Sequence, residues 1–147
     1  MNYREQDSAQ TLREGLDEYH GANPGFQFGD FLGMPRDVVQ AHDVCHIVFG
    51  CGSTAGDELI VETWTALGTH IPAQKYAQML SEGLGGEIVR TFGIYRMLRR
   101  LVLTGPRLLK VLWAVARLRK RWPHFEYEAY WDRPLGTLRK EFGITVV

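Results

Sequence analysis

Apolar residues recur at helical spacings along most of the chain, and few stretches alternate apolar and polar residues as a half-buried strand would. Prolines and glycines mark the expected helix ends. We expect helices over about residues 8–20, 35–49, 55–67, 72–82, 87–103, 106–122 and 132–143. No repeat or linker divides the sequence. These patterns predict an all-α fold, a helical bundle that forms a single domain over residues 1–147.

Polar residues before several of these segments are candidate helix caps. Thr54, with Asp57 three residues on, resembles a capping box for the helix that starts at Ala55. Asp7 or Ser8 is the expected cap of the first helix, and Asp132 that of the last. Near the C-terminus we expect a set of apolar and aromatic side chains to pack in the core: Tyr130, Trp131, Pro134, Leu135, Leu138 and Phe142.

Two histidines interrupt an otherwise apolar helix. His42 and His46 are four residues apart, so they lie on one face of the helix over 35–49. A pair at this spacing is a common way to present two metal ligands. If the next helix folds back around Gly52, Glu58 falls opposite His46 and Glu62 near His42. The sequence therefore predicts a metal site between two antiparallel helices, where bundles often build one.

Other interpretations of these polar residues stay open. A histidine on such a helix is more often a hydrogen-bonded core residue than a ligand. Asp43 points about 100° away from His42 around the helix, so it could orient a ring from behind. Glu62 fits a solvated position or a water-mediated contact. Two histidines with carboxylates suit Zn, Fe, Mn or Co and leave open coordination positions, and no catalytic residue beyond this site stands out.

Charge is balanced overall but unevenly distributed. Residues 88–125 contain ten of the seventeen Lys and Arg residues and no Asp or Glu. On the helix expected over 106–122, one basic stripe is formed by Arg107, Lys110, Arg117 and Arg121. It suits an anionic membrane surface or an isoprenoid pyrophosphate, although a charge stripe alone is more often a solvated face. No motif for nucleic acid accompanies it. No run of about 18 apolar residues predicts a membrane span.

The cysteines and the first residues bear on the cellular compartment. Cys45 and Cys51 are too few for a disulfide framework, which favours a reducing interior. The opening MNYREQDS lacks the apolar core of a signal peptide. We therefore expect a cytoplasmic location.

The spacing His42-Asp43-x-x-His46, eleven residues, then Glu58 resembles the signature of the coenzyme Q (ubiquinone) biosynthesis protein 4 family. The ending YEAYWDRPLGTLRKEFGI and the aromatic Trp64 are also similar to that family, and the resemblance covers about residues 36–145. The chain is shorter than eukaryotic members and has no mitochondrial presequence, which suggests a bacterial member. Asp57 stands where the family pattern has a glycine.

The resemblance implies an all-helical, often dimeric protein, peripheral on the inner face of the bacterial plasma membrane, working beside other ubiquinone-biosynthesis proteins. It implies a metal held by His42, Asp43, His46 and Glu58, next to a pocket for an isoprenoid-tailed precursor. The implied reaction is oxidative decarboxylation of a polyprenyl 4-hydroxybenzoate at ring carbon 1, where a hydroxyl replaces the carboxylate. Glu62 is not part of the family motif.

Two other functions fit the same residues. The protein could be a non-catalytic scaffold of the ubiquinone-biosynthesis complex that binds isoprenoid lipid and holds a structural metal. It could also be a metal phosphohydrolase of the HD type, because His-Asp occurs in that class too. Such enzymes usually need further histidines and aspartates, and the remaining His20, His70 and His124 form no comparable cluster in the sequence.

Overall fold

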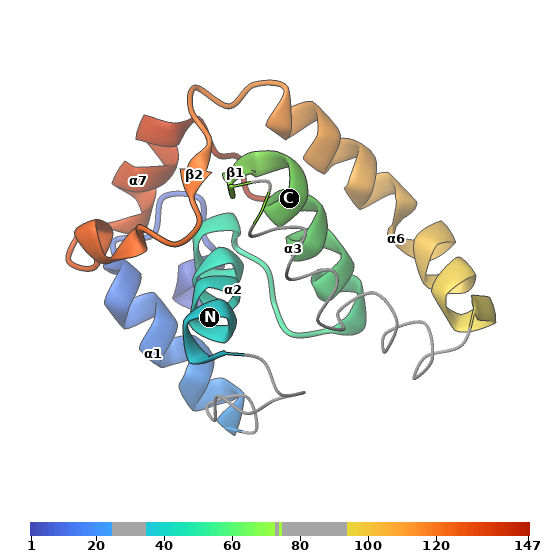
Figure 1. The fold of residues 1–147 in the computed structure, drawn as a ribbon, viewed down its shortest axis with the longest axis horizontal. Helices are drawn as coiled ribbons and strands as arrows, with labels where there is room; N and C mark the ends of the chain where they lie inside the picture. Colours follow the sequence, from blue (N-terminus) through green and yellow to red (C-terminus); the bar gives the residue numbers. More distant parts are fainter. Residues whose placement is uncertain (25–34, 73, 75–93) are drawn as a thin grey trace.

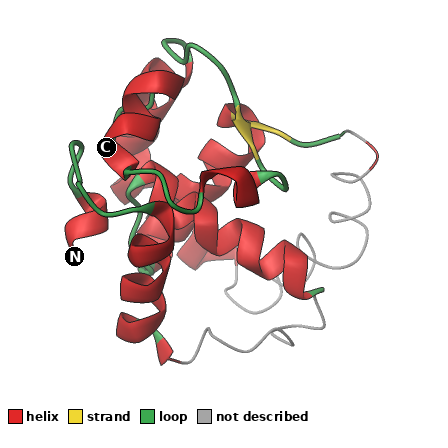
Figure 2. Cartoon of the chain, turned by 90° about the vertical axis from the view of Figure 1, so that its left-hand side faces the viewer, coloured by secondary structure: helices red, strands yellow, loops and turns green. Residues whose placement is uncertain are grey.

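The computed structural model describes residues 1–24, 35–72, 74 and 94–147, and this part of the chain is mostly helical (Figures 1 and 2). The helices are α1 (Leu12–Ala22), α2 (Arg36–Phe49), α3 (Ala55–Gly68), α6 (Ile94–Val115) and α7 (Leu135–Phe142), with 3-10 turns η1 (Asn2–Arg4) and η5 (Tyr127–Tyr130). The two strands β1 (Thr69–His70) and β2 (Trp122–Pro123) are only two residues long each. The prediction of an all-α fold is confirmed.

Helix α2 lies near the centre of the fold, with α1 and α7 on one side and α3 and α6 on the other (Figure 1). Its apolar residues are buried on nearly every side, as its sequence indicates. Phe49 at its end stacks on Trp64 of α3, with ring centroids 4.5 Å apart and planes 5° apart. The polar residues of α2 therefore lie inside the protein, where each needs a partner.

The first and third helices differ in how well their starts were predicted. Thr54 caps α3 by accepting a hydrogen bond from the Asp57 amide, as expected. The expected cap of the first helix is wrong, because α1 starts at Leu12 with Thr11 as its N-cap. Thr11 and Glu14 form a complete capping box, which satisfies two backbone amides at once. That reciprocal pair outweighs a single cap at Asp7 or Ser8.

The expected cap of the last helix is also wrong. Pro134 occupies the N-cap of α7 without a side-chain cap, and Asp132 instead pairs with Arg13, 3.3 Å away. The expected packing of this region is largely correct. Leu135, Leu138 and Phe142 are buried, Tyr130 and Trp131 pack against the core, and Pro134 is exposed.

Asp132→Ala is expected to change the free energy of unfolding by less than about 0.5 kcal/mol, because exposed ion pairs contribute little. Thr11→Ala should cost about 1 kcal/mol, since it removes a working N-cap. Urea unfolding of the two variants measures both. A larger loss for Asp132→Ala than for Thr11→Ala would show that Asp132 acts as a cap after all.

From Ile94 to Val115 the basic region forms one helix, where the sequence predicted a break between helices over 87–103 and 106–122. Helix α6 continues through Pro106 and ends at Val115. A proline inside a helix costs about 3 kcal/mol, and packing against α3 offsets it: Val111 and Ala114 are buried, and Arg107 pairs with Asp57 at 2.9 Å. Arg117 and Arg121 lie beyond the helix end, so the predicted four-residue stripe along one helix is wrong. Residues 87–93 and 75–82 of the expected helices lie outside the described residues.

The short parallel pair of strands joins the end of α3 to the segment that follows α6. Thr69 lies opposite Trp122, and His70 opposite Pro123. The ring of Trp122 is buried and contacts Tyr130 and Phe142. Among the described helices, none is long and apolar enough to cross a membrane.

Arg139 of α7 is the largest charged side chain in the core. It is 0% exposed, and its guanidinium donates hydrogen bonds to the carbonyls of Tyr3, Glu5, Ile47 and Val48. Two of these carbonyls belong to the last turn of α2, where carbonyls lack helical partners and a cation is favoured. Burial lowers the pKa of Arg139 to about 10, so it is charged at neutral pH. This residue ties α7 and the N-terminus to the end of α2.

Candidate metal centre

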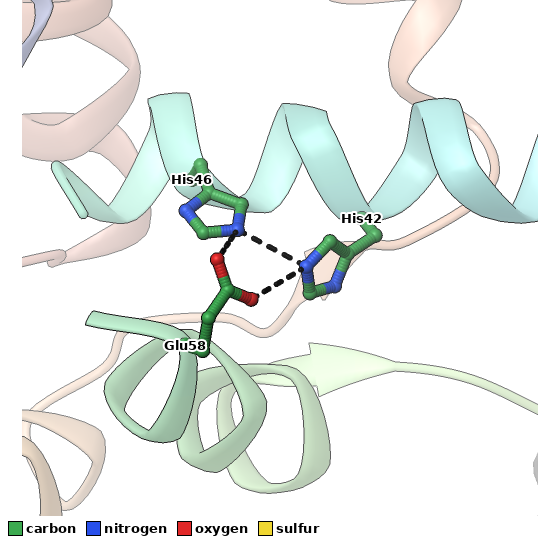
Figure 3. A group of neighbouring side chains, drawn as sticks. All are labelled: His42, His46 and Glu58. Atoms are coloured by element: carbon green, nitrogen blue, oxygen red, sulfur yellow. Dashed lines mark hydrogen bonds and ion pairs between the residues drawn. The ribbon is translucent and has the colours of Figure 1, made fainter. Parts of the chain in front are cut away.

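Two histidines of α2 and one glutamate of α3 point at one another (Figure 3). The Nε2 atoms of His42 and His46 are 3.0 Å apart. Glu58 lies 3.3 Å from His42 Nε2 through Oε2, and 3.5 Å from His46 Nε2 through Oε1. The three residues form a group in which all potential ligand atoms lie within 4.8 Å of one another. The convergence of both histidines with Glu58 follows the hairpin spacing in the sequence.

The environment of His46 fixes which nitrogen is left for a ligand. Its Nδ1 is 2.8 Å from the carbonyl oxygen of Gly52, and a carbonyl only accepts, so Nδ1 carries the hydrogen. The neutral ring then directs the lone pair of Nε2 at His42 and Glu58. The turn that brings the Gly52 carbonyl here starts at Gly50, whose φ of 70° is in the left-handed region that favours glycine.

His42 has a carboxylate near the ring nitrogen that faces away from Glu58. Its Nδ1 is 3.7 Å from Glu62 Oε1, where the hairpin spacing places that carboxylate. Nε2 of each ring therefore lies toward Glu58, while Nδ1 of His46 is hydrogen-bonded to the Gly52 carbonyl and Nδ1 of His42 is within ion-pair distance of Glu62, too far for a direct hydrogen bond. Such outer partners orient the imidazoles of metal sites and raise their basicity.

The charges of the group favour a cation between its members. Burial raises the pKa of Glu58, but hydrogen bonds to His42 and His46 outweigh it, and the pKa falls to about 2. Burial lowers the pKa of His42, and the nearby Glu58 and Glu62 raise it by more. Because a carboxylate only accepts, each of these hydrogen bonds needs a proton on Nε2 of the histidine. A metal ion bound between the three residues would take the place of those protons.

The spacing of the donor atoms fits a single metal ion. Zinc–nitrogen and zinc–oxygen bonds of about 2.0–2.2 Å imply separations of about 3.3 Å between ligands at tetrahedral angles. The two Nε2 atoms are 3.0 Å apart, Glu58 Oε2 is 3.3 Å from His42 Nε2, and Glu58 Oε1 is 3.5 Å from His46 Nε2, so each histidine is near a different oxygen of the same carboxylate. Three protein ligands also leave at least one position open, which is typical of catalytic rather than structural zinc sites.

Asp43 is not part of this group. Its carboxylate is buried and lies 2.8 Å from Nε2 of His20 on α1. Burial raises the pKa of Asp43, and the hydrogen bond to His20 acts against that shift. The structure therefore brings together three of the four expected ligands and pairs the fourth with another histidine. A ligand role for Asp43 stays a prediction.

Helix α1 covers one side of His46, a contact that the sequence did not predict. The ring of Tyr19 stacks on that of His46, with centroids 5.0 Å apart and planes 25° apart. Burial raises the pKa of Tyr19, so its hydroxyl keeps its proton. The apolar spacing of Leu12, Leu16 and Tyr19 on α1 signals a buried face, but it does not show which helix that face meets.

Comparison of the chain with protein-family models, curated proteins and solved structures found no match in any of the three. The function proposed below therefore depends on two observations alone. They are the geometry of His42, His46 and Glu58 and the resemblance of the motif.

His124 and the two cysteines lie outside the group of His42, His46 and Glu58. His124 Nδ1 is 3.3 Å from Cys45 Sγ, with both residues buried. Cys45 and Cys51 are free thiols, and burial raises the pKa of Cys51 to about 12. The pKa of Cys45 is raised for the same reason. These thiols are packed as apolar groups, not prepared as nucleophiles.

Glu62→Gln is expected to weaken metal binding about tenfold, since loss of an outer partner typically costs 10–100-fold. Competition with a chelator of known affinity measures this. Glu126→Gln, an exposed glutamate far along the sequence, is the control and should leave the affinity unchanged. An unchanged affinity for Glu62→Gln would make Glu62 an ordinary surface residue.

Proposed function

We propose that His42, His46 and Glu58 bind a divalent metal ion (Zn, Fe, Mn or Co) and that the protein uses it in ubiquinone biosynthesis. The substrate is a prenylated 4-hydroxybenzoate-type precursor, and the reaction is oxidative decarboxylation at ring carbon 1. The observation that carries this proposal is the convergence of two Nε2 atoms and one carboxylate at metal-ligand spacing. The resemblance of the motif supports the choice of substrate.

The residues have distinct parts in this proposal. His42, His46 and Glu58 would hold the ion, while the Gly52 carbonyl and Glu62 orient the two rings. The buried ring of Tyr19 covers His46 and keeps water from that side. When bound, the ion would act as a Lewis acid with open positions for the carboxylate and phenol oxygens of the substrate.

The reaction needs an oxidant. The carboxyl group leaves as CO2 and the same ring carbon gains a hydroxyl, which is a two-electron oxidation of the ring. Dioxygen supplies one oxygen atom to the ring, and a two-electron donor reduces the other atom to water. An isoprenoid tail keeps the substrate in a bilayer, so the protein would work as a peripheral protein on the cytoplasmic face of the plasma membrane.

The proposal is tested with protein purified without a histidine tag. We expect about one metal ion per chain by elemental mass spectrometry, as a single three-ligand site predicts. We also expect labelled CO2 to be released from a carboxyl-labelled prenyl 4-hydroxybenzoate in the presence of dioxygen and a reductant. Metal and lipid bound without turnover would favour the scaffold function instead. Protein that takes up no metal would refute the site.

The HD-type phosphohydrolase is less well supported. His124 contacts Cys45, and His70 is exposed on β1. Within the described residues, no second cluster of histidines and aspartates completes such a site.

A further inference from the structure

The outward side of α6 is apolar. Leu109, Leu112 and Trp113 are 69%, 47% and 55% exposed. At about 100° per residue they fall within one arc of the helix, opposite the buried Val111 and Ala114. A surface helix normally carries polar residues on that side.

This clustering stands out in the described part of the chain. The other large apolar side chains that are exposed there are Met1 and Leu67, which belong to the N-terminus and to α3. Three of five such residues therefore share a single face of α6. Contiguous exposed apolar patches typically mark protein or membrane contacts.

Cations flank this face. Lys110 is exposed beside Leu109, and the guanidinium of Arg117 lies 3.3 Å from the ring centroid of Trp113. The sequence from 88 to 125 has no acidic residue. Two cations of the region are engaged elsewhere, because Arg107 pairs with Asp57 and Lys120 with Glu141. Lys110 and Arg117 therefore place positive charge next to the exposed apolar residues.

The charge distinguishes between two occupants. A second copy packed on this face about a twofold axis would bring Lys110 and Arg117 toward their own counterparts, with no acidic residue of the segment to compensate. Like charges at a desolvated interface are unfavourable. An anionic bilayer offers an apolar layer for leucine and tryptophan and phosphates for the cations.

We propose that the α6 face, formed by Leu109, Leu112 and Trp113 with Lys110 and Arg117, docks on a bilayer of anionic phospholipid. The apolar side chains enter the boundary between headgroups and acyl chains, and the helix lies in the plane of the surface. The inference rests on the membrane location in the proposed function and adds the face that makes the contact. Its test requires neither metal nor substrate.

Vesicle binding by the full chain tests the proposal. Sedimentation uses phosphatidylcholine vesicles with and without phosphatidylglycerol, at low and high salt. We expect binding to anionic vesicles at least about tenfold stronger than to neutral ones, and weaker at high salt. Leu109→Gln with Trp113→Gln should lower anionic binding at least about tenfold, as apolar contacts are lost. Leu67→Gln, on α3, is the control and should not.

Tryptophan fluorescence reports the contact directly. Of the four tryptophans, Trp64 and Trp122 are 0% exposed and Trp131 is partly buried against the core, whereas Trp113 on the α6 face is exposed. Vesicles should therefore shift the emission to the blue, and Trp113→Phe should bind but lose most of the shift.

Equal binding to neutral and anionic vesicles would overturn the proposal, and so would unchanged binding by the Leu109/Trp113 double variant. A chain that is dimeric in light scattering, and made monomeric by the double variant without vesicle binding, would assign the face to a second copy. Metal content should stay at the wild-type value in every variant, so a failed vesicle test leaves the metal proposal standing.

Discussion

Arg139→Met should destabilise the protein by about 4 kcal/mol, a large share of the 5–15 kcal/mol that stabilises a typical domain. The methionine fills similar space but donates no hydrogen bond. The carbonyls of Glu5 and Ile47 keep backbone amide donors from Ser8 and Gly50. Those of Tyr3 and Val48 lose the donor that Arg139 provides, and each buried carbonyl without a donor costs about 1–3 kcal/mol.

Urea unfolding followed by circular dichroism measures the loss. Lys140→Met is the matched control, because Lys140 is the next residue but is 73% exposed and pairs only with the exposed Asp7. Its effect should stay within about 0.5 kcal/mol. Similar stabilities for Arg139→Met and Lys140→Met would mean that the buried hydrogen bonds contribute little.

Glu58→Gln should weaken metal binding by more than about 100-fold, the upper end of what loss of an outer partner costs, since it removes the negative ligand itself. In the wild type, metal at 100 times its dissociation constant should stabilise the fold by about 2.7 kcal/mol. For a chain of this size, that is a rise of several degrees in melting temperature. A chelator should reverse the rise, and in Glu58→Gln the metal should produce almost none.

His46→Ala should abolish the same thermal shift, but its side chain is 0% exposed and the variant can lose stability by itself. Glu58 is half-exposed, so Glu58→Gln keeps the fold and makes the outcome decisive. His70→Ala on β1 removes an exposed histidine and is the control for non-specific metal binding. A thermal shift of wild-type size in Glu58→Gln would show that the metal binds elsewhere.

The local signals in the sequence predict α1, α2, α3 and α7 but not all of their ends, and they divide α6 into two helices. Thr54 and Gly143 mark ends that short-range chemistry decides: a cap, and a left-handed turn at φ 75°. Pro106 predicts a helix start. However, α6 continues through it, because Val111 and Ala114 pack in the core. Packing between segments that are distant in the sequence keeps α6 continuous at Pro106. The local pattern of residues around a proline does not indicate such packing.

In the candidate site too, some residues could be predicted from the sequence and some contacts could not. His42, His46 and Glu58 were predictable because a helix pair joined by a short turn mirrors residues about its centre. Tyr19 and the partner of Asp43 both lie on α1, and their contacts depend on how α1 packs against α2. The sequence does not indicate that Arg139 is buried, because Lys140 and Glu141 follow it directly. Its burial follows from the meeting of α7, the N-terminus and the end of α2.

The ion pair between Asp57 and Arg107 has an evolutionary consequence. Asp57 is buried between Arg107 and Arg4, directly before Glu58, at the position where the resembled family has a glycine. A glycine there would leave Arg107 without this partner, and an aspartate without Arg107 would be a buried charge with weaker compensation. The effects of substitutions at two residues in such contact are coupled, and co-varying pairs are typically in spatial contact. Among homologous sequences, we expect aspartate at position 57 to occur with a basic residue at 107, and glycine at 57 to release that constraint.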